Sequence, residues 1–246
     1  MALREHFEQT GNLLFKVRSY MPILLLVIFL LALNDYEYLN HSYILDQIWK
    51  VFCLIISFAG LGFRILTIGF TPRGTSGRNV KGQIADELNT TGLYSVIRHP
   101  LYFGNFFICL GISMFFHIWW ICVIYILIFW LYYERIMFAE EEFLRKKFGT
   151  EFFEWTQQTH AFWPVLKNYR ENELEFSLKK VLKQEYSGFF SIIVTFALLE
   201  VLGNFYLHGK FELNLMWIFI LTVGFIIYLT IAILRKTTKL LSFTGR

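Results

Sequence analysis

The sequence predicts an all-α integral membrane protein with about six transmembrane helices. Composition is the first reason: 56% of the 246 residues are hydrophobic and 17% are charged, whereas an average soluble domain is about 25% charged. The second reason is a set of six apolar runs, each near the roughly 20 residues that a helix needs to cross a bilayer. The third is the distribution of basic residues, which alternates between the two sides of a six-helix arrangement.

The apolar runs set the order of the predicted helices. They cover 20–39, 48–70, 101–117, 119–138, 188–207 and 213–234. The first run could be mistaken for a signal peptide, but it has no clean small-x-small cleavage site, so we expect a retained anchor. The third and fourth runs are joined so tightly that they predict a helical hairpin.

Lysine and arginine test this arrangement. Of the 23 basic residues, 20 lie in the N-terminal tail, the segments 71–100 and 134–187, and the C-terminal tail. The positive-inside rule then places both termini in the cytoplasm. The net charge of +4 therefore reflects topology, and no nucleic-acid partner is expected. Abundant Phe, Ile, Leu and Lys with little Ala point to an AT-rich genome, and we expect a bacterial inner membrane.

Composition excludes several other classes. The three cysteines, Cys53, Cys109 and Cys122, lie in apolar runs and have the spacing of neither a disulfide framework nor a zinc site. Four prolines and no Gly-X-Y period exclude a collagen-like or proline-rich chain. We therefore expect no metal site.

The first string of polar residues precedes the third apolar run, with the sequence GLYSVIRHPLYFGN at 92–105. Pro100 is suited to a first helical turn, which places Arg98 and His99 at the entrance of the helix. Tyr102 follows within the first turn, and Gly104 permits a close backbone approach. A helix N-terminus also favours a negative group.

The second string follows the fourth run, with the sequence ERIMFAEEEFLRKKFGTEFFEW at 134–155. Glu134 and Glu141 are seven residues apart and so share a helical face, with Glu140 beside it. Acidic residues at 140–142 next to a membrane are costly unless they are partnered, and the basic run at 145–147 offsets them. Because the hairpin brings both strings to one end, we expect function where they meet.

Each feature also has a purely structural interpretation. Arg-His-Pro is typical of a basic flank at a helix start, consecutive Glu residues are usually a solvated face, and aromatic residues often form an interfacial belt. Their combination at one hairpin end is less easily explained in this way.

Together the two strings resemble the motifs of the isoprenylcysteine carboxyl methyltransferase family and its phospholipid methyltransferase relatives. The first is similar to G-x-Y-x-x-x-R-H-P-x-Y-x-G. The second is similar to E-E-x-x-L-x-x-x-F-G-x-x-Y-x-x-Y, with the register kept at Glu140, Glu141, Leu144, Phe148 and Gly149. Phe162 and Pro164 resemble a closing aromatic-x-Pro. Phe152 and Trp155 replace the two motif tyrosines, so their hydroxyl groups are lost.

This resemblance implies that S-adenosylmethionine binds at the cytoplasmic membrane surface and that a lipidic acceptor reaches it from the bilayer. It implies a cofactor pocket lined by Tyr94, His99, Tyr102, Gly104, Glu140 and Glu141. Arg98 would hold the pocket or an anionic acceptor, and Arg98 and His99 are the predicted catalytic residues.

The chemistry constrains what the site needs. Methyl transfer from a sulfonium is an in-line displacement, for which an enzyme mainly positions and desolvates the reactants. A carboxylate or phosphate acceptor needs no general base, whereas an amine does, and His99 or a Glu could serve. We expect a membrane lipid headgroup, through phosphate or amine, or an isoprenylcysteine-like carboxylate.

Three regions follow from this interpretation. Residues 1–70 form an N-terminal two-helix membrane region, 71–165 the methyltransferase core with the third and fourth runs, and 166–246 a linker and C-terminal transmembrane hairpin. The motifs leave the polar segment 71–92 unassigned. Arg64 either snorkels or guides an anionic headgroup, and Glu200 is either functional or paired within the C-terminal hairpin.

Two other functions remain open. An NADPH-dependent membrane sterol-type reductase has a similar stretch, typically H-P-N-Y followed by Gly-Glu, where this chain has Leu101 and Asn105. A non-enzymatic membrane protein, such as a channel or scaffold, would use the motif residues as structural flanks. The sequence does not fix the oligomeric state.

Overall fold

The structure is a computed structural model that describes residues 2–18, 27, 30–31, 33–72 and 83–238. Its helices are α1 (Leu3–Val17), α3 (Tyr43–Phe70), α4 (Leu93–Val96), α5 (Pro100–Ser113), α6 (Trp119–Phe148), α7 (Thr150–Gln158), α8 (Leu178–His208) and α9 (Leu215–Thr237). Short 3₁₀ helices cover Leu33–Asp35, Leu39–His41 and Leu166–Asn168. These described residues contain no strand, so the predicted all-α class is confirmed.

The long helices begin and end at residues suited to those positions. Side-chain oxygens of Ser42, Ser177 and Asn214 accept backbone N–H groups in the first turns of α3, α8 and α9. Pro100 is the first residue of α5. Helix α6 ends at Phe148 and is followed by Gly149, whose φ of +53° favours glycine.

Four helices, α3, α6, α8 and α9, are long and apolar enough to cross a membrane. They correspond to the second, fourth, fifth and sixth predicted runs. The third run, 101–117, becomes α5, whose 14 residues span about 21 Å, less than the roughly 30 Å of a bilayer core. Half of the first run, 20–39, lies outside the described residues, and the end of the run forms 3₁₀ turns. The predicted count of six is therefore not confirmed.

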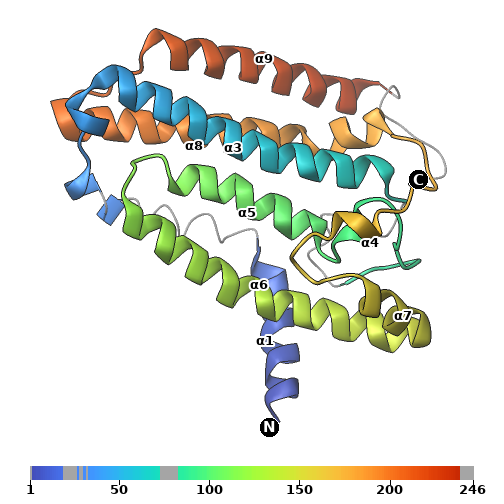
Figure 1. Cartoon of the computed structure of the whole chain (residues 1–246). Coiled ribbons are helices and arrows are strands. Elements are labelled where there is room, and N and C mark those ends of the chain that lie inside the picture. Colours follow the sequence, from blue (N-terminus) through green and yellow to red (C-terminus); the bar gives the residue numbers. More distant parts are fainter. Residues whose placement is uncertain (1, 19–26, 28–29, 32, 73–82, 239–246) are drawn as a thin grey trace.

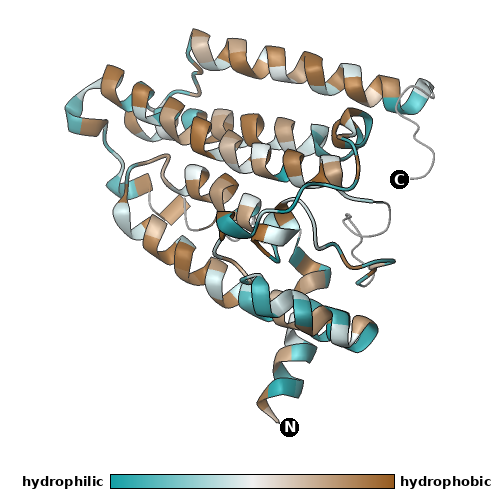
Figure 2. Ribbon diagram, turned by 45° about the vertical axis from the view of Figure 1, so that its right-hand side comes forward, coloured by the Kyte–Doolittle hydropathy of each residue, from teal (hydrophilic) through white to brown (hydrophobic). Residues whose placement is uncertain are grey.

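The helices pack in successive layers (Figure 1). Helix α9 covers α8, α3 lies between α8 and α5, and α5 packs on α6, which also contacts α1. The predicted hairpin is confirmed as α5 and α6, joined at 114–118. Hydrophobic residues run along the long helices, and hydrophilic ones gather on loops and around α7 (Figure 2).

The bundle has two distinct ends. One end, called the motif end here, carries Arg98, His99, Glu140 and Glu141. The other, the far end, carries the α5–α6 turn with His117 and the start of α9 at Asn214 (Figure 1).

Close packing of α3 against α5 depends on glycine. A Cβ atom added to Gly60 would lie 2.5 Å from the carbonyl oxygen of Gly104. A Cβ added to Gly104 would lie 2.8 Å from the Gly60 oxygen and 2.5 Å from Cγ of Arg64. The close approach expected at Gly104 therefore occurs, and it brings two helix backbones together.

We predict that Gly60→Ala destabilises the protein by roughly 1–3 kcal/mol, because the added methyl group overpacks the helix contact. Gly62, on the same helix, has nothing within 4 Å of an added Cβ, so Gly62→Ala is the matched control. Gly62→Ala is expected to be neutral or slightly stabilising, since alanine has a higher helix propensity than glycine. Thermal unfolding in detergent measures both, and equal effects would refute the packing argument.

Candidate functional site

The first motif string lies against an extended segment that follows α7. Backbone N–H groups of Arg98 and His99 donate to the carbonyl oxygens of His160 and Ala161, at 2.9 and 3.2 Å. Val165 donates in turn to Val96, at 3.0 Å. Residues 159–165, which we call the strap, thereby hold the entrance of α5 in place.

Glu141 of α6 joins the two motif strings. Its Oε1 atom accepts hydrogen bonds from Nε of Arg98 at 2.9 Å and is 3.0 Å from Nε2 of His99. The Nη1 group of Arg98 donates to the carbonyl oxygens of Thr156 and Thr159. Arg98 thus uses its guanidinium to connect α6, the end of α7 and the start of the strap.

Glu140 completes the cluster from the neighbouring position. It accepts a hydrogen bond from the hydroxyl of Tyr102 at 2.7 Å, and its other oxygen lies 3.5 Å from Nδ1 of His99. The His99 and Tyr102 rings stack, with centroids 5.7 Å apart. The side chains of Glu140 and Glu141 are 23% and 25% exposed, whereas that of His99 is 6% exposed. The two carboxylates are therefore partly accessible to solvent, whereas the imidazole that contacts both of them is buried.

The environment of His99 favours its charged form. Burial acts to lower its pKa, but the hydrogen bonds and charges of Glu140 and Glu141 outweigh burial and raise it above the ordinary value. The stabilisation from protonated His99 is thus complete below the ordinary histidine pKa and is lost as pH rises through the raised one. A raised pKa favours the protonated imidazole, which donates hydrogen bonds to both carboxylates and is less suited to act as a general base.

The third acidic residue, Glu142, has a different role. It pairs with Arg4 of α1 at 2.7 Å and with Arg145 one turn along α6. Lys146 pairs with Glu8 of α1, and Lys147 donates to the carbonyl of Ala85. The basic run offsets Glu142 as expected, but the carboxylates of Glu140 and Glu141 are partnered by the first string.

Arg64 is an internal connector. It donates to both carboxylate oxygens of Glu185 on α8, at 3.0 and 2.7 Å, and to Asn105 on α5 at 2.8 Å. The side chain of Glu185 is 4% exposed. The ion pair therefore ties α8 to the core, and Gly104 lies against the aliphatic part of Arg64.

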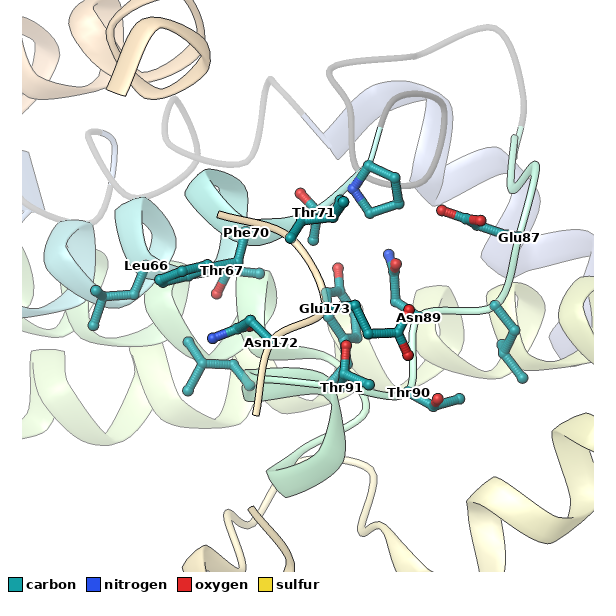
Figure 3. A pocket seen from close by; sticks show the side chains of 15 residues that line it. Leu66, Thr67, Phe70, Thr71, Glu87, Asn89, Thr90, Thr91, Asn172 and Glu173 are labelled. Atoms are coloured by element: carbon teal, nitrogen blue, oxygen red, sulfur yellow. The ribbon is translucent and has the colours of Figure 1, made fainter. Parts of the chain in front are cut away.

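A cavity of about 310 Å³ lies at the end of α3, with Tyr94 of α4 in its wall (Figure 3). Its walls come from α3, the segment before α4, α4 itself and residues 172–174. Two carboxylates, Glu87 and Glu173, lie in these walls. The neutral polar residues of the walls are Thr67, Thr71, Asn89, Thr90, Thr91, Tyr94 and Asn172. None of the described lining residues is Lys or Arg.

Tyr94 connects the cavity to the carboxylate cluster. It lines the cavity, and burial together with the charge of Glu140 raises the pKa of its phenol. Its carbonyl oxygen accepts a hydrogen bond from the indole of Trp155 at 2.9 Å. Of the six predicted cofactor-binding residues, only Tyr94 lines the cavity, and the charge of Glu140 acts on its phenol from the carboxylate cluster.

Sequence reasoning identified the cluster but missed most of the cavity. The polar segment 71–92 was noted without a role, and it supplies Asn89, Thr90 and Thr91. Asn172 and Glu173 follow the strap and had no sequence signal. Phe152, Trp155 and Phe162 are buried, so these three aromatic residues belong to the core, whereas Phe153 and Trp163 are exposed.

Comparison with known protein families gives a match for the segment that carries the two motif strings. Residues 50–151 match the family model of phospholipid methyltransferases. The family resemblance is confirmed for that segment. It includes the first string and most of the second, with all the predicted site residues. No solved structure matches the chain.

Two curated relatives match about half of the chain. The nickel-cobalt-cadmium resistance protein NccN of Alcaligenes xylosoxydans xylosoxydans is 31% identical over 125 residues. The cobalt-zinc-cadmium resistance protein CzcN of Cupriavidus metallidurans is 33% identical over 125 residues. Each match covers 51% of this chain and 56% of the relative. In the described part of this chain, no group of three or more His, Cys, Asp and Glu is placed to hold a metal ion.

We predict that Arg98→Lys loosens the strap, because a single ammonium cannot replace the several directed N–H groups of a guanidinium. Hydrogen exchange at residues 156–165 is expected to become faster. Arg170→Lys is the control, since Arg170 makes its side-chain contact with Gln158 at an exposed position. Unchanged exchange in the Arg98 variant would show that the strap is held by its backbone bonds alone.

Proposed function

We propose that the protein transfers a methyl group from S-adenosylmethionine to a lipidic acceptor at the cytoplasmic surface of a membrane. The observation that carries this proposal is the cluster of Glu140, Glu141, His99 and Tyr102, from which the charge of Glu140 reaches Tyr94 in the wall of the cavity. Its position within a phospholipid methyltransferase segment supports a methyltransferase activity. The finer assignments, namely the cofactor, the acceptor and the orientation, are proposals.

The residues present fit this cofactor. The cavity of about 310 Å³ lies at the lower end of the range of about 300–1,000 Å³ for small-molecule sites. Its neutral amide and hydroxyl groups suit the polar edges of an adenosine. The carboxylates of Glu87 and Glu173 in its wall, and of Glu140 beyond Tyr94, complement the positive charges of a sulfonium and an α-amino group.

S-adenosylmethionine supplies a methyl group whose bond to sulfur breaks as its bond to an acceptor oxygen or nitrogen forms. The residues of the chain hold and orient the reactants. Glu140 offers its carboxylate to positive charge, and Tyr102 and His99 fix that carboxylate through hydrogen bonds. Arg98 acts as a positioning residue, because its contacts are with Glu141 and backbone carbonyls.

The acceptor is proposed to arrive from the bilayer. The cavity lies where the spanning helix α3 ends, and Leu66, Phe70 and Leu174 contribute apolar wall beside the polar groups. A headgroup could therefore enter while its acyl chains stay in the lipid. A phosphate or carboxylate oxygen is already nucleophilic at neutral pH. An amine would have to lose a proton, and a carboxylate of the cluster, such as that of Glu140, is placed to accept it.

The first test is calorimetric titration of the purified protein with S-adenosylhomocysteine, with NADPH as the parallel ligand. We expect micromolar binding of the first and none of the second. Glu140→Gln is expected to weaken binding of S-adenosylhomocysteine about tenfold or more, since it removes a negative charge that complements the positive α-amino group of the ligand. Glu142→Gln is the matched control, because Glu142 faces Arg4 and Arg145. Binding of NADPH alone would instead identify a reductase.

The acceptor is tested by supplying S-adenosylmethionine with a labelled methyl group to membranes that contain the protein. Label is expected in the lipid fraction, and the labelled species identifies the nucleophilic atom. Membranes with the Glu140→Gln variant are the control and should lose the label. Label found only in protein after lipid extraction would contradict a lipid headgroup acceptor.

A further inference from the structure

A second cluster of charged residues lies at the far end of the bundle, away from the motif residues. The ammonium of Lys50 lies 2.6 Å from Oδ2 of Asp46 and 2.7 Å from Oε2 of Glu200, and it donates to the hydroxyl of Tyr36 at 2.8 Å. The side chains of Asp46, Lys50 and Glu200 are at most 1% exposed. We call these four residues the far-end cluster.

The charges of this cluster do not balance. Two carboxylates face one ammonium, which leaves one negative charge at a site shielded from water. An uncompensated charge in such surroundings is costly, and buried charges are normally paired. The glutamate is well satisfied, since its second oxygen accepts a hydrogen bond from Gln47 at 3.0 Å.

The imbalance is localised on one atom of Asp46. Its Oδ2 atom accepts from Tyr36 and contacts Lys50. Its Oδ1 atom is buried and accepts no hydrogen bond from any described residue. His117 faces this oxygen from the α5–α6 turn, with its Nε2 atom 3.6 Å from Oδ1.

His117 connects this oxygen to water. It lies in the turn between α5 and α6 with φ +47°, and its side chain is 19% exposed. Its Nε2 atom lies 2.8 Å from the carbonyl oxygen of Glu37, and because a carbonyl can only accept, Nε2 carries a hydrogen. Protonation of Nδ1 would give the ring the one positive charge that the far-end cluster lacks.

We propose that Asp46 and His117 form a proton-binding site that docks the α5–α6 turn onto α3. The ligand is a proton from the aqueous phase at the far end. A protonated ring is positive and a neutral ring is not, so the turn is held most firmly when that phase is acidic. The proposal does not depend on the methyltransferase activity, because none of these residues belongs to the motif end.

Other groups around the site have fixed or distant roles. Tyr36 stacks at a tilt against the His117 ring, with centroids 5.9 Å apart. Glu37 is exposed and lies 3.6 Å from His41. The C-terminal end of α8 contributes His208, which contacts the hydroxyl of Tyr38, and α9 contributes the neutral Asn214 and Trp217, both bonded to Gln47.

The test is thermal unfolding at pH 5.5 and pH 8.0 for the wild type and for His117→Gln. We expect the wild type to gain roughly 2–4 °C at pH 5.5 from this contact, the effect of one modest interaction in a chain of this size. His117→Gln should lose that gain. His41→Gln is the matched control, because His41 is also at the far end but 86% exposed. The contribution of His99 is present in all of these proteins and cancels.

Asp46→Asn tests the coupling. In that variant the ammonium and Glu200 balance, so His117→Gln should cause no further change in pH dependence. An equal effect of His117→Gln in both backgrounds, or none in the wild type, would overturn the proposal. If Asp46→Asn does not fold, ¹⁵N spectra of the histidine rings decide, with His117 assigned by its loss in His117→Gln. A doubly protonated His117 ring at pH 5.5 supports the site, and a neutral ring there refutes it.

Discussion

The contact of Glu141 with Arg98 and His99 is the constraint on which the motif end depends. It joins α6 to the entrance of α5, and through Arg98 it reaches the carbonyl groups of Thr156 and Thr159. Hydrogen bonds between charged partners are stronger than neutral ones, and partial burial reduces their screening by water. Arg98 extends this contact to the strap at Thr159, and His99 extends it to the stacked ring of Tyr102.

The helices themselves are held by two different means. Glycines at 60 and 104 allow α3 and α5 to approach backbone to backbone, which favours dispersion over polar contact. The antiparallel helices α3 and α8 are instead joined by a side-chain ion pair at each end. Arg64 pairs with Glu185, and Lys50 pairs with Glu200. These two ion pairs are separated by about 14 residues of helix, or roughly 21 Å. Such spacing fixes the register of one helix on the other.

Local sequence rules predicted much of this structure. Apolar runs located four long helices, Pro100 marked a helix start, and the tight hairpin placed the two motif strings at one end, where Glu140 and Glu141 lie beside His99. Partners distant in sequence were not predictable, because they depend on how the helices pack. From the sequence, Glu200 is either a functional residue or paired within the C-terminal hairpin. In the structure its ionic partner, Lys50, lies on α3.

The cavity shows the same division. Its wall combines the end of α3, the polar segment before α4, and residues 172–174, three pieces with no shared periodicity. Thr67 and Thr71 were hidden within or just after an apolar helix, where hydropathy averages over them. Short polar segments acquire meaning only when tertiary contacts bring them together.

The position of α8 has a consequence for where the working unit of this protein ends. Residues 172–174 and Glu185 lie beyond the segment that matches the family, yet the first complete the cavity wall and the second holds Arg64. Lys180 also donates to the carbonyl oxygens of Thr71 and Pro72, where α3 ends. A boundary drawn from homology alone would therefore cut through the wall of the cavity. The segment before α8 supplies part of that wall, and α8 itself holds Arg64 and the end of α3, so neither is a detachable appendage.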